Sequence, residues 1–466
     1  MLRFALPLLL LAGCSSEPPG GTLAVAVAGE GPDAVALAEQ LAAEASEATL
    51  ISRGPGGELA PGLATSWRFL DSGSDLILRL APVRWPANGG QGPELAARDV
   101  VLSLGRTPRH YRPALAATGL AGRGTARAPI ARVVELSPRP ATPHLLDWLA
   151  EPALAVRDRR GRPFPGPYAA RRDGNGWQLE RRSEMAQPAA RAARISLSLL
   201  PADGAIREFA AGRRALVLGT GLAGLGAVRA SDQGRDIRIE AVDGVIGLAM
   251  RSGGALGDAR LRRALWLAAD GGPLANRVAL AALVPQSRLW SQLPPAADDR
   301  SRPLTDRRAE ARALLAEAGY GPDRPLRLRL AVPAGPDWLQ LAEALANHLV
   351  PIGINLTVAP ADRADLLLEE HVANVPDAVV HLARWSCARA RPCSPEADQL
   401  LAEAAAVGNN PVRRLALAAA AETEMQADPA FVPLLRPVRW ALVAERLTGF
   451  QPNRLGRHPL GRISAE

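Results

Sequence analysis

The stretch most informative about the fold, residues 57–104, reads GELAPGLATSWRFLDSGSDLILRLAPVRWPANGGQGPELAARDVVLSL. Trp67 and Phe69 alternate with polar residues before the polar tetrad 71–74, and leucines alternate at 76, 78 and 80 after it. Alternation on both sides of a turn-forming tetrad predicts a β-hairpin. Asp99, followed by an apolar run, is typical of a helix start.

A later stretch predicts two parallel strands joined by a helix. In residues 326–332 leucine alternates with arginine before Ala331 and Val332, which indicates a strand. Asp337 is a candidate N-cap for a helix whose apolar residues recur at helical spacing until Gly353. Residues 354–358 form the next strand, and a crossover of this kind implies a parallel pair.

Short motifs follow one another in a recognisable order along the chain. They are Gly-x-Leu-x-Pro-x-Leu-Ala-x-Ser-Trp at 57–67, Arg79 with Trp85, Asp99-Val100-Val101, Gly166-Pro167-Tyr168, the helical segments 258–270 and 311–320, Ile352-Gly353-Ile354, and Gly449-Phe450-Gln451-Pro452-Asn453. This series resembles extracellular solute-binding protein family 5, the peptide/nickel-type ligand-capturing components of ABC importers. The chain looks like a divergent member.

The resemblance implies an α/β fold of two lobes, the periplasmic-binding-protein or Venus-flytrap fold of type II and cluster C, with an extra inserted subdomain. The ligand is then expected between the lobes, which close by hinge motion. The implied division is a signal peptide at 1–13, a tether at 14–22, lobe I at 23–44, 165–243 and 433–466, the inserted subdomain at 45–164, and lobe II at 244–432.

The N-terminal residues predict export and lipid anchoring. Residues 1–13 combine a positively charged start with an apolar run too short to span a bilayer, as in a secretory signal. Leu11-Ala12-Gly13-Cys14 resembles a bacterial lipobox, which implies cleavage before Cys14 and diacylglycerol on its thiol. The alternatives are a plain signal peptide and a short buried segment. Ser15 stands where an inner-membrane retention signal would place Asp, which favours anchoring at the outer membrane. We expect the protein to be a monomer on the periplasmic side of the envelope.

The charge of the chain comes from arginine alone. All 55 basic residues are arginine, and the formal net charge is +8. Such a balance can indicate binding to nucleic acid or to anionic lipid. Here the arginines are dispersed, aromatic residues make up only 4% of the chain, and no segment interleaves the two types. We therefore expect no nucleic-acid partner.

Two cysteines remain after Cys14. Cys387 and Cys393 bracket the short loop Cys-Ala-Arg-Ala-Arg-Pro-Cys. In an oxidising compartment such a close pair predicts a local disulfide. A metal pair is disfavoured because His381 is the only nearby histidine and no second cysteine pair exists.

A glycine-rich segment offers a rival interpretation. Gly219-Thr220-Gly221-Leu222-Ala223-Gly224 follows an apolar strand, and Glu240 ends a later one. That pattern is typical of a dinucleotide-binding loop with an acid for the ribose, and would make the chain an NAD-dependent oxidoreductase. The helix after Gly224 would be very short, however, and the fingerprint usually lies near the start of its domain.

Other catalytic patterns are missing from the sequence. No Gly-x-Ser-x-Gly nucleophile elbow occurs, and the six histidines are scattered without zinc-like spacing. We expect no catalytic residue, no metal and no cofactor, and hence no enzyme.

The candidate ligand-binding residues are Trp385, Arg384, Ser386, Met250 and Arg251. Trp385, after a strand expected at 379–383, matches the family's Gly-Trp at the cleft. It either stacks on a ligand or lies buried under the cysteine loop. Arg251, Arg384 and Arg389 would recognise a carboxylate or phosphate if they face the cleft, and are otherwise surface residues.

Departures from the family pattern bear on the ligand. Peptide-binding members carry an Asp shortly after this Trp that pairs with the free amine, whereas residues 386–389 here contain no acid. Met250 replaces a frequent Asn. A peptide bound through its free amine is therefore disfavoured, and an acidic or modified oligopeptide is favoured.

Taken together, the sequence predicts the substrate-binding lipoprotein of an ABC importer. It would capture an oligopeptide-like or other small solute and deliver it to a permease without chemical turnover. The alternatives are an orphan envelope binding or structural lipoprotein of the same fold and, less favoured, the NAD-dependent oxidoreductase. Neighbouring permease and ATPase genes would support transport.

Overall fold

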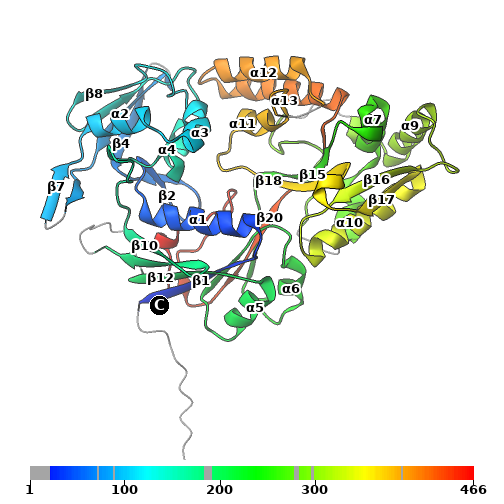
Figure 1. The fold of residues 1–466 in the computed structure, drawn as a ribbon. Coiled ribbons are helices and arrows are strands. Elements are labelled where there is room, and N and C mark those ends of the chain that lie inside the picture. The colour runs from blue at the N-terminus through cyan, green and yellow to red at the C-terminus, as the bar shows by residue number, and fades with distance from the viewer. Residues whose placement is uncertain are drawn as a thin grey trace, which may run out of the picture.

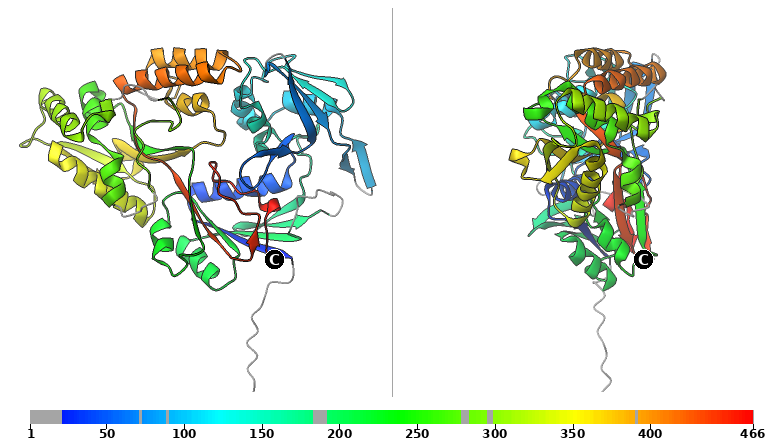
Figure 2. Two further views of the ribbon diagram at one scale, coloured as in Figure 1. Left: turned by 180° about the vertical axis from the view of Figure 1, so that it is seen from behind. Right: turned by 90° about the vertical axis from the view of Figure 1, so that its right-hand side faces the viewer.

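A computed structural model describes residues 21–70, 73–87, 90–182, 192–277, 283–294, 299–389 and 392–465. The expected signal peptide and Cys14 lie outside these residues. Figure 1 shows three parts, and Figure 2 shows that they form a flattened body, much narrower when viewed from the side.

The first part is built on a seven-stranded sheet of order β10-β11-β12-β1-β13-β20-β14. Its elements are β1 (Thr22–Ala28), α1 (Pro32–Ser46), β10 (Tyr168–Asp173), β11 (Gly176–Arg181), β12 (Arg194–Leu200), α5 (Ala202–Ala210), β13 (Leu216–Gly219), α6 (Leu225–Ala230), β14 (Ile237–Ala241) and β20 (Val438–Val443). The central strand β1 runs parallel to both neighbours, β12 and β13.

The alternation of β1 explains how helices cover both faces of this sheet. Val25 and Val27 belong to a core that includes buried residues of α1, whereas Ala26 and Ala28 face a core that includes residues of α5 and α6. Successive side chains of a strand point to opposite faces, so one apolar strand supports a helix on each side.

The second part is inserted between α1 and β10. Its elements are β2 (Ile51–Arg53), β3 (Leu59–Pro61), β4 (Ala64–Leu70), β5 (Asp75–Leu80), β6 (Arg84–Ala87), β7 (Gly90–Glu94), α2 (Ala97–Gly105), α3 (Arg112–Ala117), β8 (Ala126–Ile130), β9 (Val133–Leu136) and α4 (Leu145–Leu149). Strands β4 and β5 pair antiparallel, which confirms the predicted hairpin. Leu76, Leu78 and Leu80 of β5 are buried in the core of this part.

The third part carries a five-stranded sheet of order β17-β16-β18-β15-β19. Its elements are β15 (Gly244–Met250), α7 (Ala259–Ala268), α8 (Gly271–Arg277), α9 (Leu304–Glu317), β16 (Leu326–Ala331), α10 (Pro336–Leu349), β17 (Ile354–Val358), β18 (Leu366–Val372), α11 (Ala378–Leu382), α12 (Pro395–Ala406), α13 (Pro411–Ala427) and β19 (Phe431–Leu435). Strands β16 and β17 pair in parallel across α10, which confirms the predicted crossover.

Two sequence expectations about this part are wrong. Residues 379–383 were expected as a strand, but Ala378–Leu382 is the helix α11, and Asp377 caps it by accepting a hydrogen bond from the Val379 amide at 3.0 Å. Residues 379–383 are apolar apart from His381, and so short a segment fits a buried helix as well as a buried strand, so its periodicity could not decide. Asp337 is not an N-cap, since Gly335 takes that position in α10.

The chain passes twice between the two large sheets. It leaves the seven-stranded sheet between β14 and β15 and returns between β19 and β20. The second passage runs through 436–437, slightly beyond the division that we placed after Val432. Asp243 lies in the first passage and Arg436 in the second. The Asp243 carboxylate accepts a hydrogen bond from Arg436 at 3.2 Å and so links the two passages. In the part of the chain that is described, no helix is long and apolar enough to cross a membrane.

Candidate functional site

A depression of about 480 Å³ gathers most of the residues singled out from the sequence. It lies on the third part, and its lining comprises Ala249, Met250, Arg251, Ser252, Glu369, His371, Arg384, Trp385, Arg389 and Ala430. These residues come from the end of β15, from β18, from the short 3-10 turn Ala383–Trp385 after α11, and from the start of β19. Four of the five candidate residues therefore share one hollow.

Trp385 forms the apolar wall of this depression. Its side chain is only 7% exposed, and its ring centroid lies 5.0 Å from that of Phe431 and 5.8 Å from that of His371. Trp385 and Cys393 also line a second, very small cavity. The structure therefore places Trp385 in the core and also among the residues that line the depression, while its stacking on a ligand stays a prediction.

Positive charge dominates the rim. Arg251, Arg384 and Arg389 are exposed, and Glu369 is the one acid among the residues that line the depression. That carboxylate is engaged with His371, whose Nε2 lies 3.0 Å from its Oε2. Partial burial and the neighbouring charge of Arg389 lower the pKa of Arg384. The arrangement suits an anion, because guanidinium groups bind carboxylate and phosphate through paired hydrogen bonds.

Ser386, the fifth candidate, does not line the depression. Its hydroxyl donates to the Ala383 carbonyl at 2.9 Å and closes the turn that presents Trp385. The expected disulfide between Cys387 and Cys393 is present, with Cα atoms 5.0 Å apart. An acid that the sequence did not reveal, Asp398 of α12, accepts a hydrogen bond from the Cys387 amide at 3.0 Å.

Sequence reasoning missed Glu369 and His371. The sequence could have indicated them, because polar residues interrupt the otherwise apolar strand β18. Glu369 and His371 are two residues apart, and such side chains share one face of a strand. Their neighbour Glu370 points the other way and forms an ion pair with Arg439 of the first part, at 2.9 Å. Burial raises the pKa of Glu370, and the charge of Arg439 opposes that shift.

The glycine-rich loop at 219–224 has a different environment from that of a dinucleotide site. The amides of Gly224 and Gly226 donate to the two carboxylate oxygens of Asp337, at 2.8 and 2.9 Å. These are the amides that would otherwise face a pyrophosphate. Helix α6 has six residues, and a Cβ at Gly219 would lie 2.0 Å from the Trp440 ring. The glycines here admit a tryptophan and a carboxylate of the protein itself.

Glu240 does not serve the loop either. Its carboxylate lies 3.2 Å from His458 Nε2 and accepts a hydrogen bond from the Asn453 amide at 3.3 Å. It thereby holds the C-terminal segment against β14. Within the described ranges, no group of three or more histidine, cysteine, aspartate or glutamate side chains is arranged to hold a metal ion.

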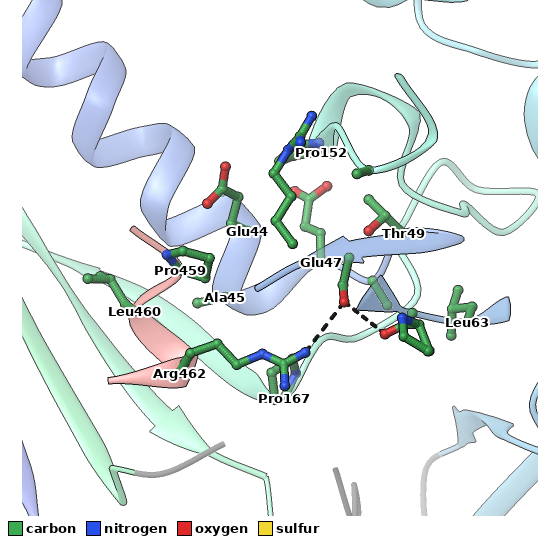
Figure 3. Close-up of a pocket in the computed structure, with 17 residues that line it drawn as sticks. Glu44, Ala45, Glu47, Thr49, Leu63, Pro152, Pro167, Pro459, Leu460 and Arg462 are labelled. Atoms are coloured by element: carbon green, nitrogen blue, oxygen red, sulfur yellow. Dashed lines mark hydrogen bonds between the residues drawn. The ribbon is translucent and has the colours of Figure 1, made fainter. Parts of the chain in front are cut away.

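Figure 3 shows a smaller cavity, of about 90 Å³, between α1, β2 and the segment 459–462. Ser52 Oγ donates to the Pro61 carbonyl at 2.8 Å and lies 3.5 Å from an Arg462 nitrogen. Glu47, on the same wall, pairs with Arg157 at 2.7 Å. The space is small and these polar groups are engaged within the protein, so it is better explained as a packing gap where the inserted part joins the first sheet.

The sequence matches a family model over residues 58–390, and its description is bacterial extracellular solute-binding proteins, family 5 Middle. No curated protein matches the chain.

Solved structures share the fold over nearly the whole chain. The murein tripeptide binding protein MppA of Escherichia coli is 18% identical, with a TM-score of 0.80 over 95% of this chain and 98% of its own. OppA of Haemophilus influenzae, complexed with RPPGFSPFR, is 16% identical, with a TM-score of 0.79 over 95% and 99%. AgaA of A. tumefaciens R10, in complex with agropinic acid, is 17% identical, with a TM-score of 0.73 over 96% and 99%. The two-lobed α/β architecture expected from the sequence is thereby confirmed.

Proposed function

The chain belongs to the bacterial extracellular solute-binding proteins of family 5, and from that premise we propose that it captures an anionic solute for an ABC permease. Proteins of the same fold bind chemically diverse ligands, since OppA was solved with RPPGFSPFR and AgaA with agropinic acid. The fold alone therefore leaves the ligand open, and the residues of the depression have to identify its class.

One observation supports an anionic ligand more than any other. Arg251, Arg384 and Arg389 line a depression whose one acidic lining residue, Glu369, already pairs with His371. A carboxylate or phosphate entering there would meet guanidinium groups able to bind it through two parallel hydrogen bonds. A free amine would meet no unpaired acid among the lining residues. The apolar edge of Trp385 would cover the uncharged part of the solute.

Capture would proceed by closure of the two large parts around their two connecting passages. The lining residues of the depression all come from residues 249–430, so a bound solute would complete its enclosure with groups of the opposite lobe. The closed, loaded form would then dock on the permease. In this mechanism the chain binds and releases the solute without changing it.

The site is tested by calorimetric titration with tripeptides matched in sequence and differing only in a free or amidated C-terminal carboxyl group. We expect the tripeptide with the free carboxyl group to bind at least tenfold more tightly than its amidated counterpart. Arg384→Gln should remove that preference. Arg327→Gln, an exposed arginine of β16 outside the depression, is the matched control for lost charge. Equal binding of both peptides, or an equal loss in both variants, would refute an anion site at Arg384.

The same proposal places the protein on the periplasmic side of the envelope, held by lipid on Cys14. Supporting this are the lipobox-like tetrad 11–14 and the family, whose solved relatives include periplasmic binding proteins. Ser15 favours the outer membrane.

A further inference from the structure

A second hollow, of about 610 Å³, lies on the inserted part and shares no lining residue with the depression around Trp385. Its walls are α2, the loop 157–163, the hairpin of β6 and β7, and the residue after β11. We call it the arginine groove, because seven arginines line it, namely Arg98, Arg106, Arg157, Arg159, Arg160, Arg162 and Arg182.

Three acids also line the arginine groove, and only Asp158 pairs with one of its arginines. Asp158 accepts a hydrogen bond from Arg162 Nε at 2.8 Å, and Asp99 accepts one from the Ala96 amide at the start of α2. Glu94 lies 3.9 Å from Arg132, outside the groove. The acids therefore neutralise few of the seven guanidinium groups.

Five of the seven arginines form no ion pair with an acid among the residues that the structure describes. Arg157 pairs with Glu47, and Arg162 with Asp158. Over the described ranges, no ion pair joins a carboxylate to Arg98, Arg106, Arg159, Arg160 or Arg182. The Nε of Arg182 is in addition buried without a hydrogen-bond partner among the described residues. Five like charges around one hollow repel each other unless an anion enters it.

The groove lies close to the point where the described chain begins. The Arg181 amide donates to Ala193, and the Arg194 amide donates to Gly21, so Arg182 is two strands away from Gly21. Two strand spacings amount to about 10 Å. The seven residue steps from Gly21 back to Cys14 span at most about 25 Å. A lipid on Cys14 would hold the groove within reach of the membrane surface.

We propose that the arginine groove binds the phosphate groups of anionic phospholipid head groups and so orients the anchored protein on its membrane. Phosphate suits the groove because each guanidinium presents a fork of donors to its oxygens. Trp85 and Leu102 add apolar side chains to the wall, as suits the boundary between head groups and acyl chains. The proposal is independent of the solute that the depression around Trp385 binds.

The test uses the mature chain from residue 14 with Cys14→Ser, so that no acyl chain contributes. Cosedimentation is measured with vesicles of phosphatidylglycerol and phosphatidylethanolamine, and with vesicles of phosphatidylcholine alone. We expect binding to the anionic vesicles only, weakening as salt is raised. Substituting Arg98, Arg106 and Arg159 together by alanine should weaken it roughly 100-fold.

The control variant replaces three exposed arginines elsewhere, Arg235, Arg327 and Arg446, by alanine, which removes the same net charge. It should bind the vesicles within about twofold of the unsubstituted chain. Equal weakening of both variants would overturn the proposal by assigning binding to overall charge. Inorganic phosphate that raises the thermal midpoint through the groove, without any vesicle binding, would equally overturn a lipid source.

Discussion

The carboxylate of Asp337 accepts a hydrogen bond of 2.8 Å from the backbone amide of Gly224, across the boundary between the two large sheets. Asp337 belongs to α10 of the third part, whereas Gly224 precedes α6 of the first. Asp337 is 4% exposed, and its other oxygen binds the Gly226 amide. One side chain therefore satisfies two backbone donors of the opposite lobe.

Replacing Asp337 by alanine should lower the free energy of unfolding by about 2 kcal/mol, because the buried Gly224 amide and the partly buried Gly226 amide lose their acceptor. Urea denaturation measures this change. Asp362→Ala is the matched control, since that aspartate is 75% exposed and should change stability by less than about 0.5 kcal/mol. If the two variants were equally stable, the contact between Asp337 and Gly224 would contribute nothing.

Arg457 connects all three parts of the molecule. Its guanidinium binds Glu44 of α1, Glu151 of the inserted part at 2.8 Å, and the Asn374 carbonyl of the third part at 3.4 Å. Arg457→Met should cost about 3–5 kcal/mol, because buried carboxylates lose their counter-charge. Arg172→Met, which breaks an exposed pair with Glu39, should cost less than about 1 kcal/mol in the same denaturation experiment. A loss as small for Arg457 as for Arg172 would contradict this expectation.

His381 should make the protein sensitive to mild acid. Burial lowers the pKa of His381 to about 3, and the charge of Arg384 adds to the effect. The unfolded chain therefore binds more protons than the folded one between about pH 6.5 and pH 3. The contribution of neutral His381 to the free energy of unfolding is therefore fully present above about pH 6.5, and it is lost as the pH falls from there towards 3.

The expected loss from His381 is about 2 kcal/mol between pH 7 and pH 5. His381→Phe, which keeps an aromatic ring between Trp290 and Trp385, should abolish that part of the acid lability. His110→Phe removes an exposed histidine and should leave the pH profile unchanged. Identical profiles for the His381 variant and the unsubstituted protein would exclude a role for this ring.

The disulfide closes a loop with a sequence separation of six residues. Thiol labelling of the unreduced, denatured chain should modify neither Cys387 nor Cys393. Reduction should lower the free energy of unfolding by about 2 kcal/mol, the chain-entropy value for so short a loop. Two labelled thiols before reduction would show that the bond does not form in the cell.

The proposed lipid anchoring requires Cys14. Cys14→Ala should release the protein from membranes, because the attached acyl chains supply the stable part of the anchor. Fractionation of cells expressing the variant measures this release, with Ser16→Ala as a control that keeps the lipobox-like tetrad. Continued membrane association of the Cys14 variant would refute anchoring by lipid.

Patterns that depend only on neighbouring residues predicted much of this structure. The alternation from Trp67 to Leu80 predicted a hairpin, and the periodic run after residue 326 predicted a parallel crossover; both formed as expected. The same logic failed at 379–383, because five residues that are apolar apart from His381 are compatible with a helix as well as with a strand. Asp377 decided the outcome by capping α11 while binding Arg414 of α13 at 2.8 Å.

The sequence by itself determined the family and the architecture, because ordered motifs and hydrophobic periodicity are local properties of the chain. Only the tertiary structure decided what the special residues do. Asp337 had the pattern of a helix cap, yet it joins the lobes by binding Gly224 and Gly226. Which partner such a side chain meets depends on contacts more than a hundred residues apart, and local spacing carries no information about those.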